Sequence, residues 1–209
     1  STLSSSSAAS DVYKRQPECR ILDAGGATGD NLLRQFGIQQ VVTLDVLPTA
    51  DVTGQIPNLP FRDRSFDVAT CIDTLEHIPP DHRKKSVEEL IRVAREAVFL
   101  VAPFNSEENN RAEEIVLKYV KDPFLFEHRR YGLVRFDEID ACLDRSTKKG
   151  RVQSVEKVYL DDLLTWVMTM AKDHVDESIL YQEAFFLENR FCPRRIAVSI
   201  SLNHSGGEN

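Results

Sequence analysis

Glycines and carboxylates are concentrated near the start of the chain, at a spacing suited to binding a nucleotide-type ligand. The segment ILDAGGATG, residues 21–29, carries an apolar run that reaches Asp23 and is followed by Gly25, Gly26 and Gly29. Glycines allow the backbone to approach a ligand closely, in dihedral angles that a Cβ resists. A second acid, Asp45, ends the next apolar run, VVTLD. A glycine turn with an acid about 20 residues further on is typical of a nucleotide-type site in a doubly wound α/β fold.

The glycine spacing distinguishes between nucleotide ligands. A dinucleotide fingerprint requires G-x-G-x-x-G, and the register that starts at Gly25 has Ala27 and Asp30 at the other two glycine positions. The pattern D-x-G-G-x-T-G instead resembles motif I of the class I S-adenosylmethionine-dependent methyltransferases. The likeness continues through LPFRDRSFDVATCIDTLEHIP, residues 59–79, and RVAREAVFLVAP, residues 92–103. It covers roughly residues 20–103 and is similar to the small-molecule members with LPF-x-D-x-SFD and LEH signatures.

This resemblance implies S-adenosylmethionine as the cofactor, and each part of that molecule needs a partner. The glycine turn would approach the amino-acid tail, and Asp23 its ammonium group. Asp45 would accept both ribose hydroxyls, because a carboxylate has two oxygens suited to a cis-diol. Structural alternatives remain open, namely a turn without ligand and a solvated strand end. The predicted cofactor-binding residues are Asp23, Gly25, Gly26, Gly29, Asp45, Asp51, Val52 and Asp73, of which Asp51 and Val52 would contact the adenine edge.

Three polar residues, Asp73, Glu76 and His77, follow the predicted fourth strand at i, i+3, i+4 spacing. On a helical segment this spacing places them on one side. They can shape the acceptor pocket, His77 can act as a general base, or the trio can bind a divalent metal through two carboxylates and an imidazole. The commonest role of such residues is structural, with hydrogen bonds to loop backbone, and from the sequence we assign no metal ligand.

A second candidate site lies in FLFEHRRYGL, where the residues of interest are Glu127 and His128. Histidine titrates near operating pH and can take a proton from an attacking hydroxyl. His128 and His77 are therefore the predicted catalytic residues, although a lone histidine in a loop is more often structural. Phe124 and Tyr131 can line an acceptor pocket or be core residues. After the fourth strand the chain reads CIDT, so the N/D-P-P-Y/F signature of methyltransferases that act on base or amide nitrogen is absent.

The elements that would position these residues follow an alternating α/β pattern. We predict a doubly wound, Rossmann-like sheet, mostly parallel with an antiparallel last strand, which the resemblance places between strands five and six. The pattern of apolar residues predicts the elements from this alternation. The predicted strands are 20–23, 41–45, 51–53, 66–72, 97–102, 152–160 and 195–202. The predicted helices are 29–36, one that begins at the prolines 79–80, 111–121, 136–143 and 163–172.

Bulk properties limit the class of protein. The 209 residues carry a formal net charge of −7, which disfavours a nucleic-acid partner. No apolar run is long enough to span a bilayer and no secretory signal is visible, so a cytoplasmic protein is expected. Four scattered cysteines form no C-x-x-C pair, which argues against zinc and redox motifs. Residues 1–16 are Ser/Ala-rich and are expected to be a disordered tail or a sequence scar, and residues 17–209 a single domain lacking its N-terminal helices.

The predicted function is methyl transfer from S-adenosylmethionine to a small-molecule acceptor, whose identity the sequence does not reveal. Two alternatives stay open. One is an NAD-dependent enzyme, which the missing dinucleotide fingerprint disfavours. The other is a protein of the same fold that binds S-adenosylmethionine or a nucleotide and has lost catalysis. The oligomeric state is not predicted.

Overall fold

The computed structural model describes residues 19–26, 31–35, 37–187 and 192–203. They form one seven-stranded sheet in the order β3-β2-β1-β4-β5-β7-β6. The strands are β1 (Ile21–Ala24), β2 (Val41–Asp45), β3 (Val52–Thr53), β4 (Phe66–Ile72), β5 (Ala94–Pro103), β6 (Val152–Asp162) and β7 (Pro193–Leu202). All neighbours are parallel except those of β7, which runs antiparallel to both β5 and β6. The predicted Rossmann-like fold and the place of the last strand are confirmed.

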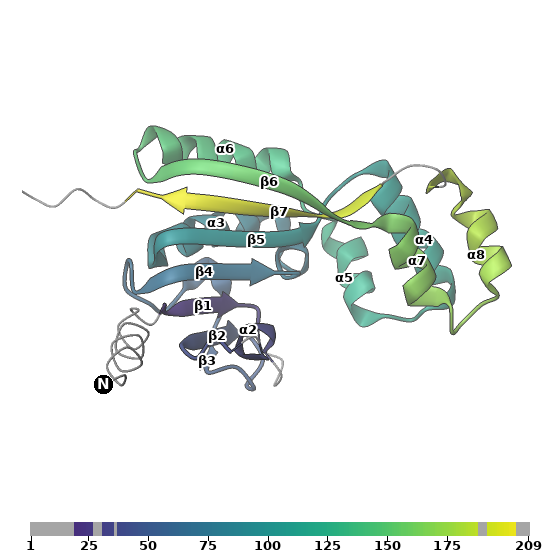
Figure 1. Cartoon of the computed structure of the whole chain (residues 1–209), viewed down its shortest axis with the longest axis horizontal. Coiled ribbons are helices and arrows are strands. Elements are labelled where there is room, and N and C mark those ends of the chain that lie inside the picture. Colours follow the sequence, from purple (N-terminus) through teal and green to yellow (C-terminus); the bar gives the residue numbers. More distant parts are fainter. Residues whose placement is uncertain (1–18, 27–30, 36, 188–191, 204–209) are drawn as a thin grey trace, which may run out of the picture.

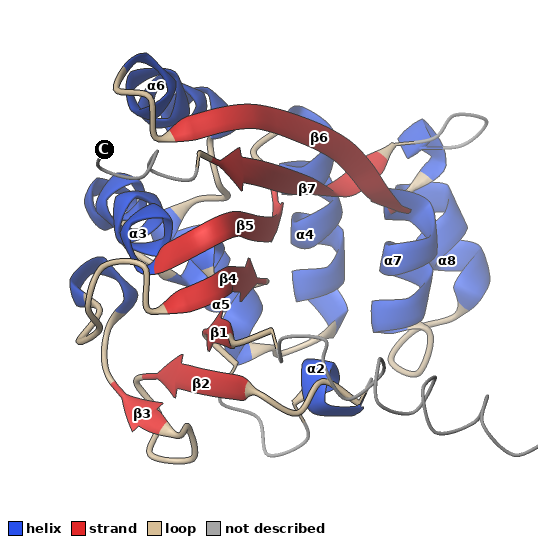
Figure 2. Cartoon of the chain, turned by 60° about the vertical axis from the view of Figure 1, so that its left-hand side comes forward, coloured by secondary structure: helices blue, strands red, loops and turns tan. Residues whose placement is uncertain are grey.

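Helices fall into two groups (Figure 1). Within the described ranges, α3 and α6 pack on the sheet, whereas α4, α5, α7 and α8 gather beyond the carboxyl ends of β1 and β4 (Figures 1 and 2). We call this second group the helical cap. The helices are α2 (Leu32–Gln35), α3 (Pro80–Val93), α4 (Glu107–Tyr119), α5 (Pro123–Tyr131), α6 (Phe136–Lys148), α7 (Leu163–Ala171) and α8 (Glu177–Glu183), with 3₁₀ turns η1 (Ile56–Asn58), η2 (Leu75–His77) and η3 (Phe185–Leu187).

Two hydrophobic clusters hold these groups. The larger one lies between the sheet and α3 and α6, around side chains with no exposure such as Leu22, Phe66 and Leu90. The smaller one fills the helical cap and includes Val116, Val167 and Leu180. The cap therefore has an interior of its own, which fixes its helices against one another next to the sheet edge.

Several predicted boundaries change in the structure. The helix predicted at 29–36 is described only as Leu32–Gln35, because residues 27–30 and 36 lie outside the described ranges. Asn31 caps it, with its Oδ1 accepting from the N–H groups of Leu33 and Arg34 at 3.1 and 3.3 Å. The FLFEHRRYGL segment, for which the sequence predicts no helix, forms most of α5.

Local sequence explains α5. The Asp122 carboxylate caps the helix by accepting from the N–H groups of Phe124 and Leu125 at 2.8 and 3.3 Å. Pro123 occupies the first helical position, where its missing N–H has no cost, and Gly132 ends the helix with φ of 74°. The helix fixes the direction of His128, which a loop would leave variable.

Candidate functional site at the carboxyl edge of the sheet

The turn after β1 connects three neighbouring strands. Gly25 has φ of 95°, and its N–H donates to the carbonyl of Leu44 at 2.7 Å, which ties the turn to the end of β2. A Cβ at Gly25 would lie 2.8 Å from the Cβ of Thr74, which follows β4. Glycine is therefore required here both for the left-handed backbone and for contact with the exit of β4.

The buried carboxylate of Asp23 fixes the same turn through hydrogen bonds. Its side chain is 8% exposed, Oδ1 accepts from the Thr70 hydroxyl at 2.7 Å, and Oδ2 accepts from the Asn31 amide at 2.5 Å. A Cβ at Gly26 would lie 2.7 Å from Asp23 Cγ and 3.0 Å from Asn31 Nδ2. Gly26 thus makes room for a buried carboxylate that fixes the turn. The ammonium contact predicted for Asp23 stays a prediction, and Gly29 lies outside the described residues.

Asp45 ends β2 directly beside this turn. Its side chain is partly exposed, and Oδ1 accepts from the N–H of Leu47 at 3.0 Å, which directs the carboxylate out of the strand end. Its carbonyl accepts from Gly54 at 2.8 Å, which ties the end of β2 to the residue after β3. Asp45 therefore lies where an acid that binds a ribose diol is expected.

Asp51 has partners within the protein, and its predicted contact with the adenine edge stays a prediction. It precedes β3 and lies level with Thr43, because Val52 pairs with Leu44. Its Oδ2 accepts from the Thr43 N–H at 2.8 Å and from the Thr43 hydroxyl at 3.1 Å, and it is ion-paired with Arg34. The N–H of Thr43 is the main cause that lowers the pKa of Asp51. Asp51 Oδ2 thus links β2 to the chain before β3. Asp51 lies level with Thr43, two residues before Asp45 at the carboxyl end of β2.

The exit of β4 turns sharply toward the helical cap. Asp73 has φ of 45°, its N–H donates to the carbonyl of Val101 at 2.8 Å, and its carboxylate is ion-paired with Arg195 of β7. Arg195 also pairs with Asp161 at the end of β6. Asp73 therefore faces β6 and β7, and η2 follows it with Glu76 and His77.

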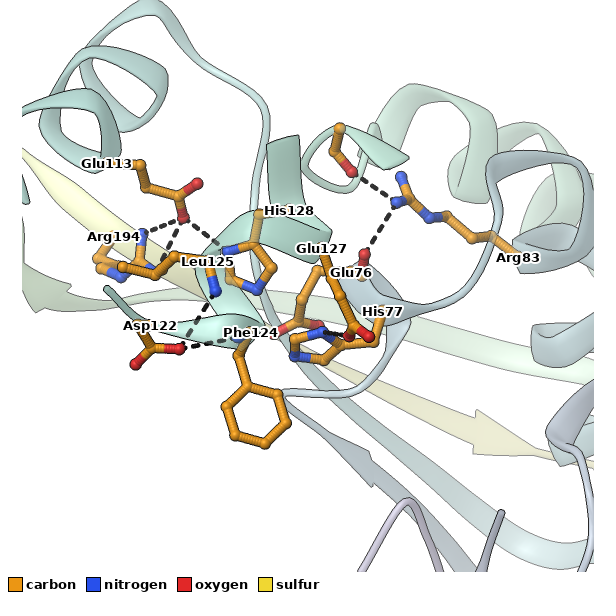
Figure 3. Close-up of polar contacts among 11 residues, drawn as sticks. Glu76, His77, Arg83, Glu113, Asp122, Phe124, Leu125, Glu127, His128 and Arg194 are labelled. Carbon is orange, nitrogen blue, oxygen red and sulfur yellow. Dashed lines mark hydrogen bonds and ion pairs between the residues drawn. The ribbon is translucent and has the colours of Figure 1, made fainter. Parts of the chain in front are cut away.

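Glu76, His77 and His128 converge although they come from η2 and α5 (Figure 3). The two imidazole centroids are 4.9 Å apart. Glu76 is 1% exposed, and burial is the main cause that raises its pKa to about 8. Burial, together with the charge of His128, lowers the pKa of His77. The structure confirms neither catalytic role, but it brings both predicted histidines to one place.

Each of these imidazoles has a carboxylate behind it. His77 Nδ1 lies 2.8 Å from Glu127 Oε2, and His128 Nδ1 lies 2.9 Å from Glu113 Oε1. When Nδ1–H donates to the carboxylate, Nε2 carries the free lone pair of the neutral ring. Glu127 was predicted beside His128, but its partner is His77.

Glu113 also receives both guanidinium nitrogens of Arg194 at 3.1 Å, and Arg194 stacks 3.6 Å from the centroid of the Trp166 ring. Sequence reasoning missed Glu113, Trp166, Arg194, Arg195 and Asp161. A local signal existed only for the arginines, which are adjacent at the start of the last strand.

A cavity of about 500 Å³ lies between the exit of β4, the start of β7 and the helical cap. Its lining combines the charged residues described above with apolar side chains from the cap, which include Phe124, Trp166 and Met170. Phe124 was a predicted lining residue; Tyr131, the other candidate, is not one of those that line this cavity. The arrangement offers a polar floor and an apolar wall, as ligand sites commonly do.

Comparison with known proteins finds a family likeness for the part of the chain that carries the glycine turn. A methyltransferase-domain family model matches residues 22–102, the stretch from β1 to β5. This confirms the predicted likeness to the class I S-adenosylmethionine-dependent superfamily. No curated protein sequence matches the chain significantly.

Solved structures agree with the methyltransferase domain in fold. The chain superposes on an S-adenosylmethionine-dependent methyltransferase from Archaeoglobus fulgidus with a TM-score of 0.55 and 14% identity, covering 93% of this chain and 91% of that one. The plantazolicin methyltransferase BpumL, solved with a triazolic desmethylPZN analog and S-adenosylhomocysteine, gives a TM-score of 0.56 at 13% identity, covering 94% of this chain and 81% of that one. Magnesium protoporphyrin IX methyltransferase from Synechocystis, also solved with S-adenosylhomocysteine, gives a TM-score of 0.51 at 14% identity, covering 92% of this chain and 78% of that one.

The family match ends at residue 102, shortly before α4, the first helix of the helical cap. The turn around Gly25, the acid Asp45 and the η2 residues lie within the family match, whereas His128 and Arg194 lie beyond it. The family match therefore supports the cofactor side of the site, while the opposite wall belongs to segments that this comparison does not describe. Within the described ranges, every helix is too short or too polar to cross a membrane.

Proposed function

We propose that the protein transfers a methyl group from S-adenosylmethionine to a small-molecule acceptor held in the cavity beneath the helical cap. One observation carries this proposal: the glycine turn and the cavity are joined at a single point, the exit of β4. Thr74 touches the turn at Gly25, and the preceding Asp73 lines the cavity. A cofactor on the turn and an acceptor in the cavity would thus be neighbours.

The residues present fit the cofactor. A Cβ at Gly25 would collide with Thr74 and one at Gly26 with Asp23, so the two glycines keep the turn closely packed between the ends of β1 and β4. Asp45 would hold the ribose diol through its carboxylate oxygens. We leave Asp51 out of the proposed site because it is occupied by Arg34 and Thr43. When bound, S-adenosylmethionine supplies a methyl group on an activated sulfonium.

The chain's own contribution on the other side is to position the acceptor and to exclude water. Positioning alone contributes several kcal/mol to such displacements, up to about 7–11 kcal/mol in the best-oriented cases. The apolar wall of Phe124, Trp166 and Met170 would cover the acceptor, while Asp73 and Arg195 would orient its polar groups. A cavity of about 500 Å³ lies within the range of small-molecule sites, which supports a metabolite over a macromolecule.

Binding of S-adenosylhomocysteine tests the cofactor half of the proposal. Calorimetry should show binding to the wild-type chain and none of NAD. Asp45→Ala should weaken binding at least tenfold, because it removes two hydrogen bonds to a charged group that are worth roughly 1.5–3 kcal/mol each. Asp144→Ala, an exposed acid on α6, is the matched control and should leave the affinity unchanged.

A folded wild-type chain that fails to bind S-adenosylhomocysteine refutes the proposal. An unchanged affinity in Asp45→Ala removes that residue from it. Release of labelled S-adenosylhomocysteine from labelled cofactor, screened against a panel of metabolites, then tests the acceptor half. Turnover with a macromolecular acceptor, and none with any metabolite, would overturn the small-molecule assignment.

A further inference from the structure

Three side chains in the cavity wall present electron-pair donors to one point. Glu76, His77 and His128 each offer one ligand atom, and these three atoms lie within 4.8 Å of one another. They come from η2 and α5, which are about 50 residues apart in the chain, so helical periodicity does not explain the convergence. Figure 3 shows the Glu76 carboxylate and the two rings directed toward a common space.

Two donors in this group lack partners although they are buried. Glu76 is 1% and His128 6% exposed, and among the described residues neither Glu76 Oε2 nor His128 Nε2 has a hydrogen-bond partner. A buried polar atom without a partner costs about 1–3 kcal/mol, and more when the group is charged. Two such atoms side by side indicate that a ligand satisfies both.

The surroundings prepare the two imidazoles to bind a cation. Nδ1 of His77 faces Glu127 at 2.8 Å and Nδ1 of His128 faces Glu113 at 2.9 Å. Metal-binding histidines commonly donate their other N–H to a carboxylate in this way, which fixes the ring and leaves Nε2 free for the metal. Both rings have this arrangement. Two unrelated structural hydrogen bonds would explain it less well than a shared ligand between the rings.

Nearby positive charges are already compensated or directed elsewhere. Arg194 is neutralised by Glu113, and Arg195 is paired with Asp73 and Asp161. The buried Arg83 donates to five backbone carbonyls, those of Glu76, Ile78, Tyr131, Gly132 and Leu133. Among the described residues, Glu127 is ion-paired only with His77, and the Glu76 carboxyl forms no ion pair although the charges of Arg83 and Arg194 act on it. A bound cation would use the free lone pair of Glu76 Oε2 and would add positive charge beside Glu127.

We propose that Glu76, His77 and His128 form a binding site for a divalent first-row transition metal of the zinc class. Two imidazole nitrogens and one carboxylate oxygen favour such an ion over Mg²⁺ or Ca²⁺, which prefer oxygen ligands. Three protein ligands would leave at least one coordination position open, and all three residues line the cavity, from which a further ligand could come. The site stands on its geometry and does not require methyl transfer.

This assignment differs from the metal-binding trio considered from the sequence and from the general-base role predicted for the two histidines. Asp73, the first member of the predicted trio, is paired with Arg195, and His128 takes its place in the cluster. A histidine lone pair that binds a metal is not available to take a proton. The site therefore replaces the general-base role predicted for His77 and His128.

Metal uptake by the full chain tests the site. After treatment with chelator and its removal, Zn²⁺ binding is measured by calorimetry and Co²⁺ binding by visible d–d absorption. We expect one equivalent of either ion and no Mg²⁺ binding at the same concentration. Glu76→Gln and His128→Ala should weaken Zn²⁺ binding more than 100-fold, since even residues behind the ligands contribute about 10–100-fold. Glu127→Gln should therefore cost about tenfold.

His82→Ala is the matched control, because His82 is exposed on α3 and lies outside the cluster. It should bind Zn²⁺ as the wild type does. Circular dichroism melts identify a variant that does not fold, and the near-isosteric Glu76→Gln keeps the test valid if His128→Ala fails. No uptake by the folded wild type, unchanged uptake in the folded ligand variants, or Mg²⁺ binding equal to that of Zn²⁺ would each overturn the proposal. Because S-adenosylhomocysteine binding is measured separately, failure of the metal site is distinguishable from failure of the proposed function.

Discussion

Gly26→Ala tests the packing that holds the glycine turn. The new Cβ would lie 2.7 Å from Asp23 Cγ and 3.0 Å from Asn31 Nδ2, so the buried carboxylate must move. Moving it breaks the hydrogen bonds from Thr70 and Asn31 at 2.7 and 2.5 Å. Each bond to a charged group contributes roughly 1.5–3 kcal/mol. Because the backbone of the turn can adjust in part, we expect a loss of about 3 kcal/mol in the free energy of unfolding.

Such a loss corresponds to a fall of roughly 6–12 °C in Tm for a chain of this length. Urea unfolding and a thermal melt measure it, and calorimetry should show that S-adenosylhomocysteine binding falls with it. Gly37→Ala is a useful comparison, because Gly37 has φ of 82° but no heavy atom within 4 Å of the added Cβ. That variant reports backbone strain without a clash, and it should leave Asp23 in place.

A double-mutant cycle separates the clash from other effects. In an Asp23→Ala background the carboxylate is gone, so the additional cost of Gly26→Ala should drop to below about 1 kcal/mol, giving a coupling energy near 2 kcal/mol. If the two substitutions are additive within about 0.5 kcal/mol, Gly26 is not required by Asp23, and the reasoning about this turn is refuted.

Two further predictions concern the parts that frame the site. Glu89→Gln should cost about 1–2 kcal/mol at pH 7, because the Glu89 carboxylate accepts from Arg92 and from the N–H of Leu59. Its pKa is lowered, first by the Arg92 hydrogen bond, so this stability is present above the ordinary value of 4.5 and lost as pH falls through the folded pKa. Urea unfolding at several pH values should show the two proteins converging in acid; a constant difference contradicts this. Asp122→Ala should lower the free energy of unfolding by about 1 kcal/mol, because it removes the cap of α5. It should also weaken Zn²⁺ binding, because α5 carries His128. An unchanged thermal melt would show that the cap is dispensable.

Sequence patterns predicted the sheet well because its strands are defined by local signals. β2 and β4 have the predicted bounds, since each is an apolar run with an aspartate at its carboxyl end, Asp45 within β2 and Asp73 directly after β4. The start of β5 was predicted three residues too late, because α3 passes into it without a loop, at Val93 and Ala94, and the exposed Arg95 and Glu96 follow. An apolar pattern cannot mark a strand that begins with polar residues directly after a helix.

The site was only partly predictable, and α5 shows the two reasons. Its boundaries were present in the sequence as Asp122, Pro123 and Gly132, a cap, a first-turn proline and a terminating glycine, and they were overlooked. Its interactions were not present in any local pattern. His128 meets Glu113 across 15 residues and Glu113 meets Arg194 across 81. Only the packing of the cap brings such partners together.

Arg83 illustrates how residues outside the motifs determine the geometry of the site. Its buried guanidinium donates to the carbonyls of Glu76 and Ile78 on one side, and to those of Tyr131, Gly132 and Leu133 on the other. Figure 3 shows Arg83 beside Glu76. These two groups of carbonyls lie within or directly after η2 and at the end of α5, the elements that supply the three proposed ligands. A buried guanidinium is stable only while its donors are satisfied, so the two segments are held at a fixed separation. The convergence of the ligands therefore depends on a side chain that touches none of the proposed metal-binding atoms.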